Sequence, residues 1–183
     1  MNSLFFRPLI NTSELSCFEC GIEVMDNFIH DGLQESLIEN NCCSYVVHDE
    51  NDRIVGFFSL MEHSLYLDDD DKDDLANGFS AASLPETMSE EQKQKLLSEV
   101  VYPVIDIAYL AVSKDMQRIG IGTAILNKII EIVKNKGNVS FITVDALYLK
   151  DEYRADTFYE RKGFQRLYPP TSENTIRMYT TIF

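Results

Sequence analysis

The sequence predicts an α+β fold with one mixed sheet, and three observations support this prediction. β-rich apolar runs recur along the 183 residues, and helix-like apolar spacing separates several of them. No Gly/Ser/Pro-rich linker divides the chain. With 45% apolar residues, the chain is long enough to bury one good core. We therefore expect a single domain over residues 1–183.

The first elements form a strand, a helical region and a hairpin. A strand is expected at residues 4–9, and apolar residues recur at helical spacing over residues 13–39. Residues 44–48 and 53–61 are typical of two strands joined by a polar turn. Gly56 in the second of these strands indicates either a bulge or simply a small strand residue.

An acidic insertion is expected over residues 64–99. Its residues 68–74 include six aspartates, whose like charges repel, so we expect a solvated loop there. A metal site is the alternative, but the run lacks the central glycine and the terminal glutamate of a calcium loop. Thr87 and Glu90 fit a capping box for a short helix that ends near Glu99.

A strand, a loop with two glycines and a helix are predicted over residues 104–136. The run 104–112 is apolar except for Asp106, as expected for a strand buried on both faces. Gly120 and Gly122 lack Cβ atoms, so the backbone there can turn tightly and approach a ligand. N–H groups at the start of the next helix would be free to bind anions such as pyrophosphate. This segment indicates a coenzyme A site.

The remaining elements alternate between strands and a helix. Residues 140–147 are β-rich, and residues 151–161 have a helical pattern. Short strands are expected at residues 164–167 and 175–181. The pattern alone does not determine the order of these strands in the sheet.

Two motifs follow one another in the second half of the chain. Q-x-x-G-x-G occupies residues 117–122, and Phe-Tyr-Glu-Arg-Lys-Gly-Phe occupies residues 158–164. In this order they resemble the GNAT superfamily of N-acetyltransferases. Phe-Glu-Cys-Gly at residues 18–21, continuing through residues 25–29, is similar to the amino-terminal signature of GNAT toxins from toxin–antitoxin modules. The resemblance covers the whole chain. It implies a twisted, mostly antiparallel sheet flanked by helices, with acetyl-CoA as acyl donor and no metal.

The resemblance also implies which residues bind acetyl-CoA. The pantetheine arm would pair with the backbone of Leu110, Ala111 and Val112. The Arg118 side chain would add a charge-assisted hydrogen bond to phosphate or would lie in solvent. The pyrophosphate would rest on Gln117, Arg118, Ile119, Gly120, Ile121, Gly122 and Thr123.

Asp106 is the predicted general base. An amine attacks a thioester in its neutral form, so a proton acceptor assists the reaction at neutral pH. Desolvation in an apolar strand raises the pKa of a carboxyl group, and the position of Asp106 resembles that of the base glutamate in histone-type GNAT enzymes. A hydrogen-bonded structural aspartate is the alternative interpretation. Glu62, His63 and Asp145 are further candidates for the base.

Tyr159 is the predicted proton donor. The resemblance places its phenol near the thioester sulfur, where it would protonate the departing thiolate. The alternative is that Phe158 and Tyr159 are core aromatics. The asparagine that many relatives carry earlier in this helix is absent, and Glu152 is nearest to its place.

The charge distribution favours a cationic acceptor. Residues 1–113 hold 5 Lys/Arg and 22 Asp/Glu, a net −17, and residues 114–183 hold 11 and 8, a net +3. The expected acceptor is therefore a primary amine on a cationic small molecule, a peptide or a protein. Acetylation of aminoacyl-tRNA is the alternative that the toxin-like segment favours and the negative field opposes. A non-catalytic acyl-CoA-binding regulator is a third interpretation.

Localisation and thiol chemistry complete the expectations. The sequence lacks an apolar run of the ~20 residues that span a membrane, and its start lacks signal-peptide features, so we expect a cytoplasmic protein without membrane contact. Cys17 and Cys20 form one C-x-x-C spacing, and Cys42 and Cys43 are adjacent. Without a second such pair or paired histidines, buried, reduced thiols are expected rather than a metal or redox site. The sequence does not determine whether the protein forms a homodimer.

Overall fold

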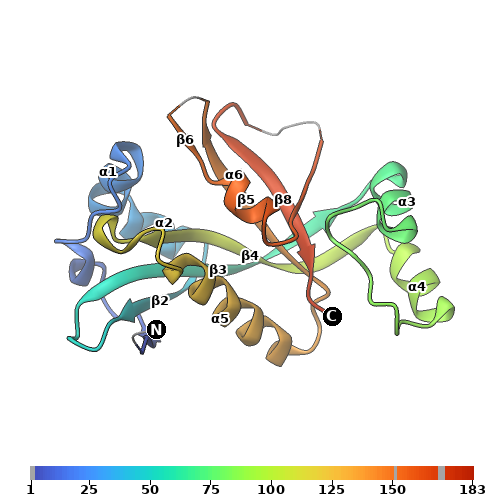
Figure 1. The fold of residues 1–183 in the computed structure, drawn as a ribbon, viewed down its shortest axis with the longest axis horizontal. Helices are drawn as coiled ribbons and strands as arrows, with labels where there is room; N and C mark the ends of the chain where they lie inside the picture. Colours follow the sequence, from blue (N-terminus) through green and yellow to red (C-terminus); the bar gives the residue numbers. More distant parts are fainter. Residues whose placement is uncertain (1–2, 151, 169–171) are drawn as a thin grey trace. The chain divides into compact units, whose positions relative to one another are not determined.

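Two compact units make up the fold in a computed structural model that describes residues 3–150, 152–168 and 172–183 (Figure 1). The first unit comprises Met1–Met61 and Ile107–Glu131, and the second comprises Glu62–Asp106 and Ile132–Phe183. Strands β3 (Ile54–Tyr66) and β4 (Val101–Val112) and helix α5 (Ile121–Lys136) contribute residues to both units.

The first unit orders its strands β1-β2-β3-β4. β1 pairs antiparallel with β2, with Phe6 opposite Val47, and β2 pairs antiparallel with β3, with Val46 opposite Phe57. The other elements of the unit precede β2 or follow β4. The bounds are β1 Phe5–Pro8, the 3-10 helix η1 Thr12–Leu15, α1 Glu23–Asp31, α2 Leu33–Glu39, β2 Cys43–His48 and the 3-10 helix η2 Lys114–Met116.

The helical prediction for residues 13–39 is wrong for residues 16–22. Three short helices form instead of one, because Gly21 adopts φ +78, which no right-handed helix accommodates. Gly32 then separates α1 from α2. Figure 1 shows the two helices side by side. Their apolar faces join Phe57 and Ala111 in a core of Leu15, Phe18, Cys20, Ile29, Leu33, Val46, Phe57 and Ala111.

Gly56 allows β3 to pack closely in the first unit. A Cβ atom at this position would lie 2.8 Å from Ile125 Cδ1 and 2.9 Å from the Ala111 carbonyl oxygen. Both distances are shorter than van der Waals contact. The register irregularity of the hairpin lies beside Gly56, since Val47 pairs with Gly56 and His48 pairs with Ile54, which leaves Val55 as an extra residue in β3. Close approach to β4 and α5 therefore explains the glycine.

The second unit orders its strands β3-β4-β5-β8-β7, and β6 also pairs with β5. The pairs β5/β6, β5/β8 and β7/β8 are antiparallel. The mixed, mostly antiparallel sheet flanked by helices confirms the predicted fold class. The bounds are α3 Asp69–Asn77, α4 Glu90–Leu97, β5 Phe141–Leu149, β6 Tyr153–Arg154, α6 Asp156–Glu160, β7 Gln165–Arg166 and β8 Thr175–Thr181.

The solvated loop expected at residues 68–74 is wrong, because helix α3 forms there. The Asp68 carboxylate accepts a hydrogen bond from the Asp71 N–H (2.8 Å), and carboxylates in a first turn complement the helix dipole. Leu75 on the same helix is buried with Leu65 and Tyr102. Capping and one apolar anchor therefore outweigh the repulsion among the aspartates.

Further element boundaries differ from the predictions. β3 continues to Tyr66 and β4 begins at Val101, so the segment between them is shorter than expected. Helix α4 is capped by Ser89 and Gln92 rather than by Thr87 and Glu90. The helix predicted from residue 151 begins at Asp156, since residues 153–154 pair with β5; residue 151 lies outside the described residues. Among the described residues, no helix is long and apolar enough to cross a membrane.

Candidate functional site

The predicted strand, loop and helix lie at the end of β4 and the start of α5. Leu110 and Val112 are partly exposed, and Ala111 is buried. Two loop positions have left-handed backbone, Arg118 at φ +63 and Gly120 at φ +98. Helix α5 follows, and its 16 residues begin directly after Gly120. By general helix geometry, the first N–H groups of α5 lack carbonyl partners within the helix and can bind anions.

The Gln117 side chain is engaged with the protein itself. Its Nε2 atom donates hydrogen bonds to the carbonyl oxygens of Cys20 (2.7 Å) and Val112 (3.0 Å). A carboxamide has two N–H donors, and both are used here. The side-chain nitrogen of Gln117 is therefore not available to a ligand, and the predicted contact with acetyl-CoA concerns the Gln117 backbone.

The toxin-like segment at residues 18–21 contacts the same loop. The Lys114 N–H donates to the Glu19 carbonyl oxygen (2.9 Å). The Asp26 carboxylate in α1 accepts hydrogen bonds from the N–H groups of Cys20 (2.7 Å) and Gly21 (3.0 Å). Sequence reasoning attributed this segment to a family signature and did not foresee these contacts.

Asp106 lies in the second unit as one partner of a buried ion pair. Its Oδ1 atom accepts hydrogen bonds from Thr143 Oγ1 (2.5 Å) and Arg177 Nη1 (2.7 Å), and its side chain is 3% exposed. Burial raises the pKa of Asp106, and the charge of Arg177 and the hydroxyl of Thr143 oppose that rise. Both interpretations from the sequence, a general base and a hydrogen-bonded structural aspartate, remain predictions.

The other base candidates differ in their surroundings. Asp145 contacts Arg177 Nη1 at 3.1 Å and is half-exposed. Glu62 is exposed and lies 3.4 Å from Lys136 Nζ. His63 is also exposed, and its charge lowers the pKa of Asp106 slightly. Asp145 therefore shares the arginine of Asp106, whereas Glu62 has a separate partner.

Tyr159 is buried in an aromatic cluster of the second unit. Its ring meets those of Phe158 and Phe164 edge to face, with ring centroids 5.1 Å apart in each pair. Burial raises the pKa of the Tyr159 phenol above its ordinary value, and Tyr153 and Asp106 add to the rise. The hydroxyl is therefore protonated at neutral pH and can act as a hydrogen-bond donor.

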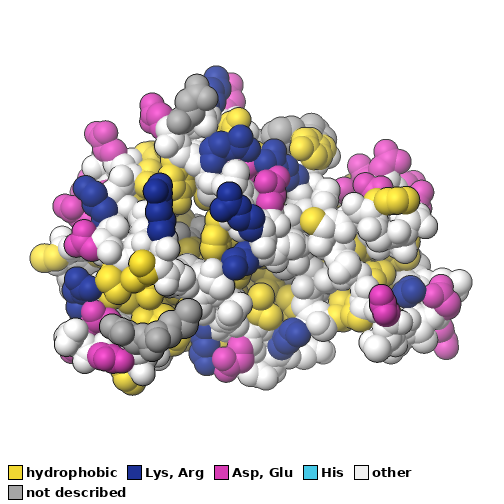
Figure 2. Space-filling view, viewed as in Figure 1, with side chains coloured by type: hydrophobic (Ala, Val, Ile, Leu, Met, Phe, Trp, Pro, Cys, Tyr) yellow, Lys and Arg dark blue, Asp and Glu magenta, His cyan; other side chains and the backbone are white. Residues whose placement is uncertain are grey.

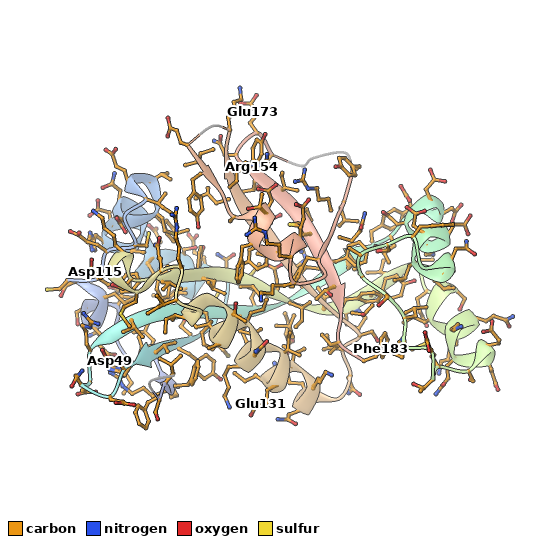
Figure 3. The ribbon with its side chains drawn as sticks, viewed as in Figure 1. Asp49, Asp115, Glu131, Arg154, Glu173 and Phe183 are labelled. Atoms are coloured by element: carbon orange, nitrogen blue, oxygen red, sulfur yellow. The ribbon has the colours of Figure 1, made fainter. Side chains whose placement is uncertain are left out.

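Sequence reasoning missed the buried carboxylate at the start of α6. Asp156 is fully buried and pairs with Arg154 (2.7 Å; labelled in Figure 3) and with Arg166. Burial alone would raise the pKa of Asp156, but the two arginines outweigh it and lower the pKa. The signal in the sequence is an acid three residues before the predicted proton donor Tyr159, with arginines on either side.

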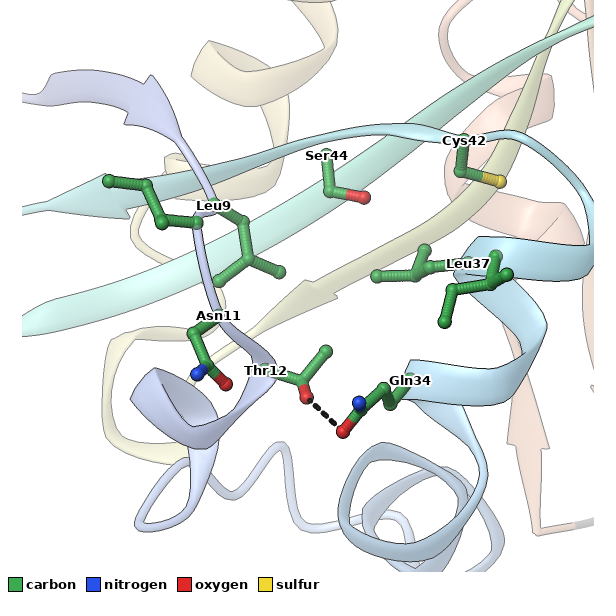
Figure 4. A pocket seen from close by; sticks show the side chains of 9 residues that line it. Leu9, Asn11, Thr12, Gln34, Leu37, Cys42 and Ser44 are labelled. Atoms are coloured by element: carbon green, nitrogen blue, oxygen red, sulfur yellow. Dashed lines mark hydrogen bonds between the residues drawn. The ribbon is translucent and has the colours of Figure 1, made fainter.

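A groove of about 380 Å³ lies elsewhere in the first unit, between α2 and the loop after β1. Figure 4 shows Thr12 facing Gln34 across it. The lining residues are Leu9, Ile10, Asn11, Thr12, Gln34, Leu37, Ile38, Cys42 and Ser44. None of the residues predicted to bind acetyl-CoA belongs to this lining.

The cysteines do not form a metal cluster in the described part of the chain. All four are free of disulfides. Burial and the neighbouring Asp26 raise the pKa of the Cys20 thiol to about 12, so this group remains a thiol. Cys17 and Cys43 are exposed, so the expectation of buried thiols is wrong for these two cysteines.

Comparison with known proteins places the chain in a family. The model of the acetyltransferase (GNAT) domain matches residues 40–166, so the chain belongs to the GNAT acetyltransferase family. It is an acyltransferase of this class, and acetyl-CoA is the donor that the family uses. No curated protein matches the chain.

Several solved structures share the fold over nearly the whole chain. A bacterial toxin superposes with a TM-score of 0.68 at 19% identity, covering 100% of this chain and 92% of its own. AtaT complexed with acetyl-methionyl-tRNAfMet superposes with a TM-score of 0.64 at 19% identity, covering 96% of this chain and 94% of its own. AtaTR bound with AcCoA superposes with a TM-score of 0.65 at 21% identity, covering 100% of this chain and 95% of its own. The likeness to GNAT toxins that the sequence predicts is therefore confirmed at the level of the fold.

Proposed function

We propose that this protein transfers the acetyl group of acetyl-CoA to a primary amine by direct attack. The observation that carries the proposal is the left-handed backbone at Arg118 and Gly120 between β4 and a 16-residue helix. This geometry brings main-chain N–H groups to a helix N-terminus, where pyrophosphate binds well. The backbone of residues 110–112 would pair with the pantetheine arm.

The chemistry requires two proton transfers. The amine nitrogen attacks the thioester carbon, a C–N bond forms, and the C–S bond breaks to release the CoA thiolate. Asp106, directly or through water, takes the proton that the nitrogen loses, and Tyr159 supplies a proton to the sulfur. Proton exchange with solvent then returns a proton to Tyr159 and removes one from Asp106. The raised pKa of Asp106 supports its role, because a weakly acidic carboxyl is a better proton acceptor. Tyr159 begins as a neutral phenol, so it carries the proton that the thiolate needs.

Tyr159→Phe tests the proposed donor. We expect kcat to fall about 10²-fold or more while the Kd for acetyl-CoA, measured by calorimetry, stays unchanged. Phe158→Leu in the same aromatic cluster is the control for packing, since it removes no hydroxyl. Equal losses of kcat in the two variants would show that Tyr159 acts only as a core residue.

Asp106→Asn tests the proposed base. If the carboxylate accepts the proton, kcat/KM falls as the pH drops through its pKa, which burial places above 3.8, and this acidic limb is lost in the variant. Asp145→Asn removes the half-exposed acid on the same Arg177 and serves as the matched control. If Asp106→Asn keeps the acidic limb of the pH profile of kcat/KM, Asp106 has only a structural role.

The acceptor that we favour is the α-amino group of an aminoacyl-tRNA. The likeness to AtaT complexed with acetyl-methionyl-tRNAfMet, over 96% of this chain, supports it. Residues 132–183 carry 8 Lys/Arg and 6 Asp/Glu, whereas residues 62–106 carry 3 and 12. Figure 2 shows the basic side chains of the second unit gathered over β5, β6 and α6, and acidic ones over α3. The basic part of this unit offers phosphate contacts that the acidic part does not.

A cationic small molecule, peptide or protein is the second candidate, favoured by the net charge of −14. Transfer of labelled acetyl groups to aminoacyl-tRNAs, compared with a panel of amines and peptides, separates the two. Arg161 and Lys162 are exposed beside α6, so Arg161→Glu with Lys162→Glu should reduce transfer to tRNA but not to a small amine. Transfer to the amine panel alone, unaffected by this charge reversal, would favour the second candidate.

A further inference from the structure

A chain of contacts in the first unit links α1 to residues 117–123, which end the loop after β4 and begin α5. The Asp26 carboxylate binds two consecutive N–H groups, those of Cys20 (2.7 Å) and Gly21 (3.0 Å). Ile22, the N-cap of α1, makes no side-chain capping hydrogen bond, so Asp26 reaches back from the first turn to hold the residues before the helix. A carboxylate in this turn also complements the helix dipole.

The same short segment presents its carbonyl groups to the loop. The Cys20 carbonyl accepts from Gln117 Nε2 (2.7 Å), and the Glu19 carbonyl accepts from the Lys114 N–H (2.9 Å). Gly21 is required by its φ of +78, and a Cβ atom there would lie 3.0 Å from Lys114 Cδ. The second N–H of Gln117 closes the loop onto Val112 (3.0 Å).

Arg118, the residue after Gln117, has a backbone conformation that needs such support. Its φ of +63 is unusual for a residue with a side chain, and such positions persist only where the surrounding structure determines them. The contacts of Gln117 fix the residue on its amino-terminal side. A loop held in its binding conformation avoids the entropy cost of ordering when the ligand arrives.

The structure assigns Asp26 and Gln117 as positioning residues of the acetyl-CoA loop. They act through Glu19, Cys20 and Gly21, and we call these five residues the brace. The inference rests on the proposed function, since it takes residues 117–123 as the pyrophosphate site. The toxin-like segment at residues 18–21 thereby acquires a mechanical role in donor binding that is independent of any acceptor.

Calorimetric titration with acetyl-CoA tests the assignment. We expect Asp26→Ala and Gln117→Leu each to weaken the Kd for acetyl-CoA about tenfold, and the double variant to lose less than the product of the two, because both act through one segment. Glu23→Ala removes an exposed acid from the same first turn of α1 and is the matched control. Asp26→Asn keeps one acceptor and the shape of the side chain, and it replaces Asp26→Ala if that variant fails to fold.

A second probe separates the brace from general damage. S-acetylpantetheine lacks the pyrophosphate, so its Kd should be the same in the wild type and in Asp26→Ala, since Asp26 bonds Cys20 and Gly21 and not the strand that would pair with pantetheine. Equal weakening for both probes would overturn the brace as a loop-specific device, and so would an unchanged Kd for acetyl-CoA in folded variants. If the wild type binds S-acetylpantetheine and acetyl-CoA equally well, or binds neither, the proposed pyrophosphate site itself fails and the brace falls with it.

Discussion

The two units satisfy their key carboxylates in different ways. Asp26 in the first unit binds two main-chain N–H groups, whereas Asp106 in the second binds the side chains of Thr143 and Arg177. Main-chain partners remain when neighbouring side chains change, but they depend on backbone conformation. Side-chain partners can be deleted singly. The first unit should therefore be sensitive to changes of shape, and the second to changes of charge.

Arg177→Met should have the largest effect on stability. It leaves the buried Asp106 carboxylate without its cation, and removing one partner of a buried ion pair costs about 3–5 kcal/mol. Without Arg177 the pKa of Asp106 rises further, so the loss of unfolding free energy is greatest at high pH and shrinks as falling pH protonates the carboxyl. Denaturant titrations at several pH values measure this dependence.

The double variant Arg177→Met with Asp106→Leu is the control for Arg177→Met. Replacing both charges by apolar groups should restore most of the lost stability. A loss in Arg177→Met that is independent of pH, or a double variant no better than the single one, would contradict the view that charge organises the second unit.

Gly56→Ala tests the opposite expectation in the first unit. The added Cβ atom would meet Ile125 Cδ1 at 2.8 Å and the Ala111 carbonyl oxygen at 2.9 Å. The side chain can move, but the carbonyl belongs to the strand predicted to pair with pantetheine. Overpacking of this kind costs about 1–3 kcal/mol, and acetyl-CoA binding should weaken in parallel. Thermal unfolding and calorimetry measure the two effects.

Gly78→Ala provides a contrast for Gly56→Ala in the second unit. Gly78 has a φ of +74, and among the described residues no neighbouring atom lies within 4 Å of the place that a Cβ atom would take. Its substitution therefore introduces backbone strain without a clash. It should lower stability while leaving acetyl-CoA binding intact. Loss of acetyl-CoA binding in Gly78→Ala but not in Gly56→Ala would reverse the comparison.

The fold could be predicted from sequence where local pattern and tertiary packing agree. The end of α5 at Lys136 was predicted, because its apolar stripe stops there and a glycine follows. Its start was not, since Gly122 was predicted for the loop but lies in the first turn of the helix. The aspartate run of α3 was not, since its helicity depends on capping by Asp68 and on burial of Leu75 against distant residues. Charge repulsion is visible in a sequence, whereas that apolar anchor is not.

The candidate site could be predicted only as far as its motifs reach. The glycine motif indicated the loop, and the apolar strand singled out Asp106. Asp106 binds Thr143 and Arg177, which lie 37 and 71 positions away in the sequence. Gln117 binds Cys20, which lies 97 positions away, and no local pattern connects these partners. The sequence therefore indicated candidate residues, but not that the Gln117 side chain turns toward the protein.

Glu14 combines both kinds of partner and gives a smaller effect. Its carboxylate accepts from Arg7 Nη2 (2.6 Å) and from the N–H groups of Ile10 and Asn11 (3.1 Å each). The Arg7 guanidinium first, and the Asn11 N–H next, lower the pKa of Glu14 from 4.5 to about 2. A lowered pKa stabilises the fold above pH 4.5, and this contribution is lost as the pH falls through about 2.

Glu14→Gln should therefore reduce the unfolding free energy by about 1–2 kcal/mol at pH 7, with a smaller difference at pH 3. Arg7→Gln removes only the charged partner and should cost less, because the two main-chain N–H groups remain bound. Denaturant titration of both variants at the two pH values ranks the partners. If Arg7→Gln costs as much as Glu14→Gln, charge rather than the main chain holds this corner of the first unit.

The Cys20 thiol gives the smallest and most local test of the brace. Burial and Asp26 raise its pKa to about 12, and only the thiolate reacts with disulfide reagents. Exposed Cys17 and Cys43 should therefore be labelled quickly at pH 8, whereas Cys20 should be labelled slowly. In Asp26→Ala the segment that carries Cys20 loses its two hydrogen bonds, so labelling of Cys20 should accelerate while that of Cys43 does not change.

Mass spectrometry of labelled peptides resolves the labelling rate of each cysteine. If Cys20 is labelled as fast as Cys17 in the wild type, this segment opens readily. Its main-chain hydrogen bonds would then not hold the first unit in shape.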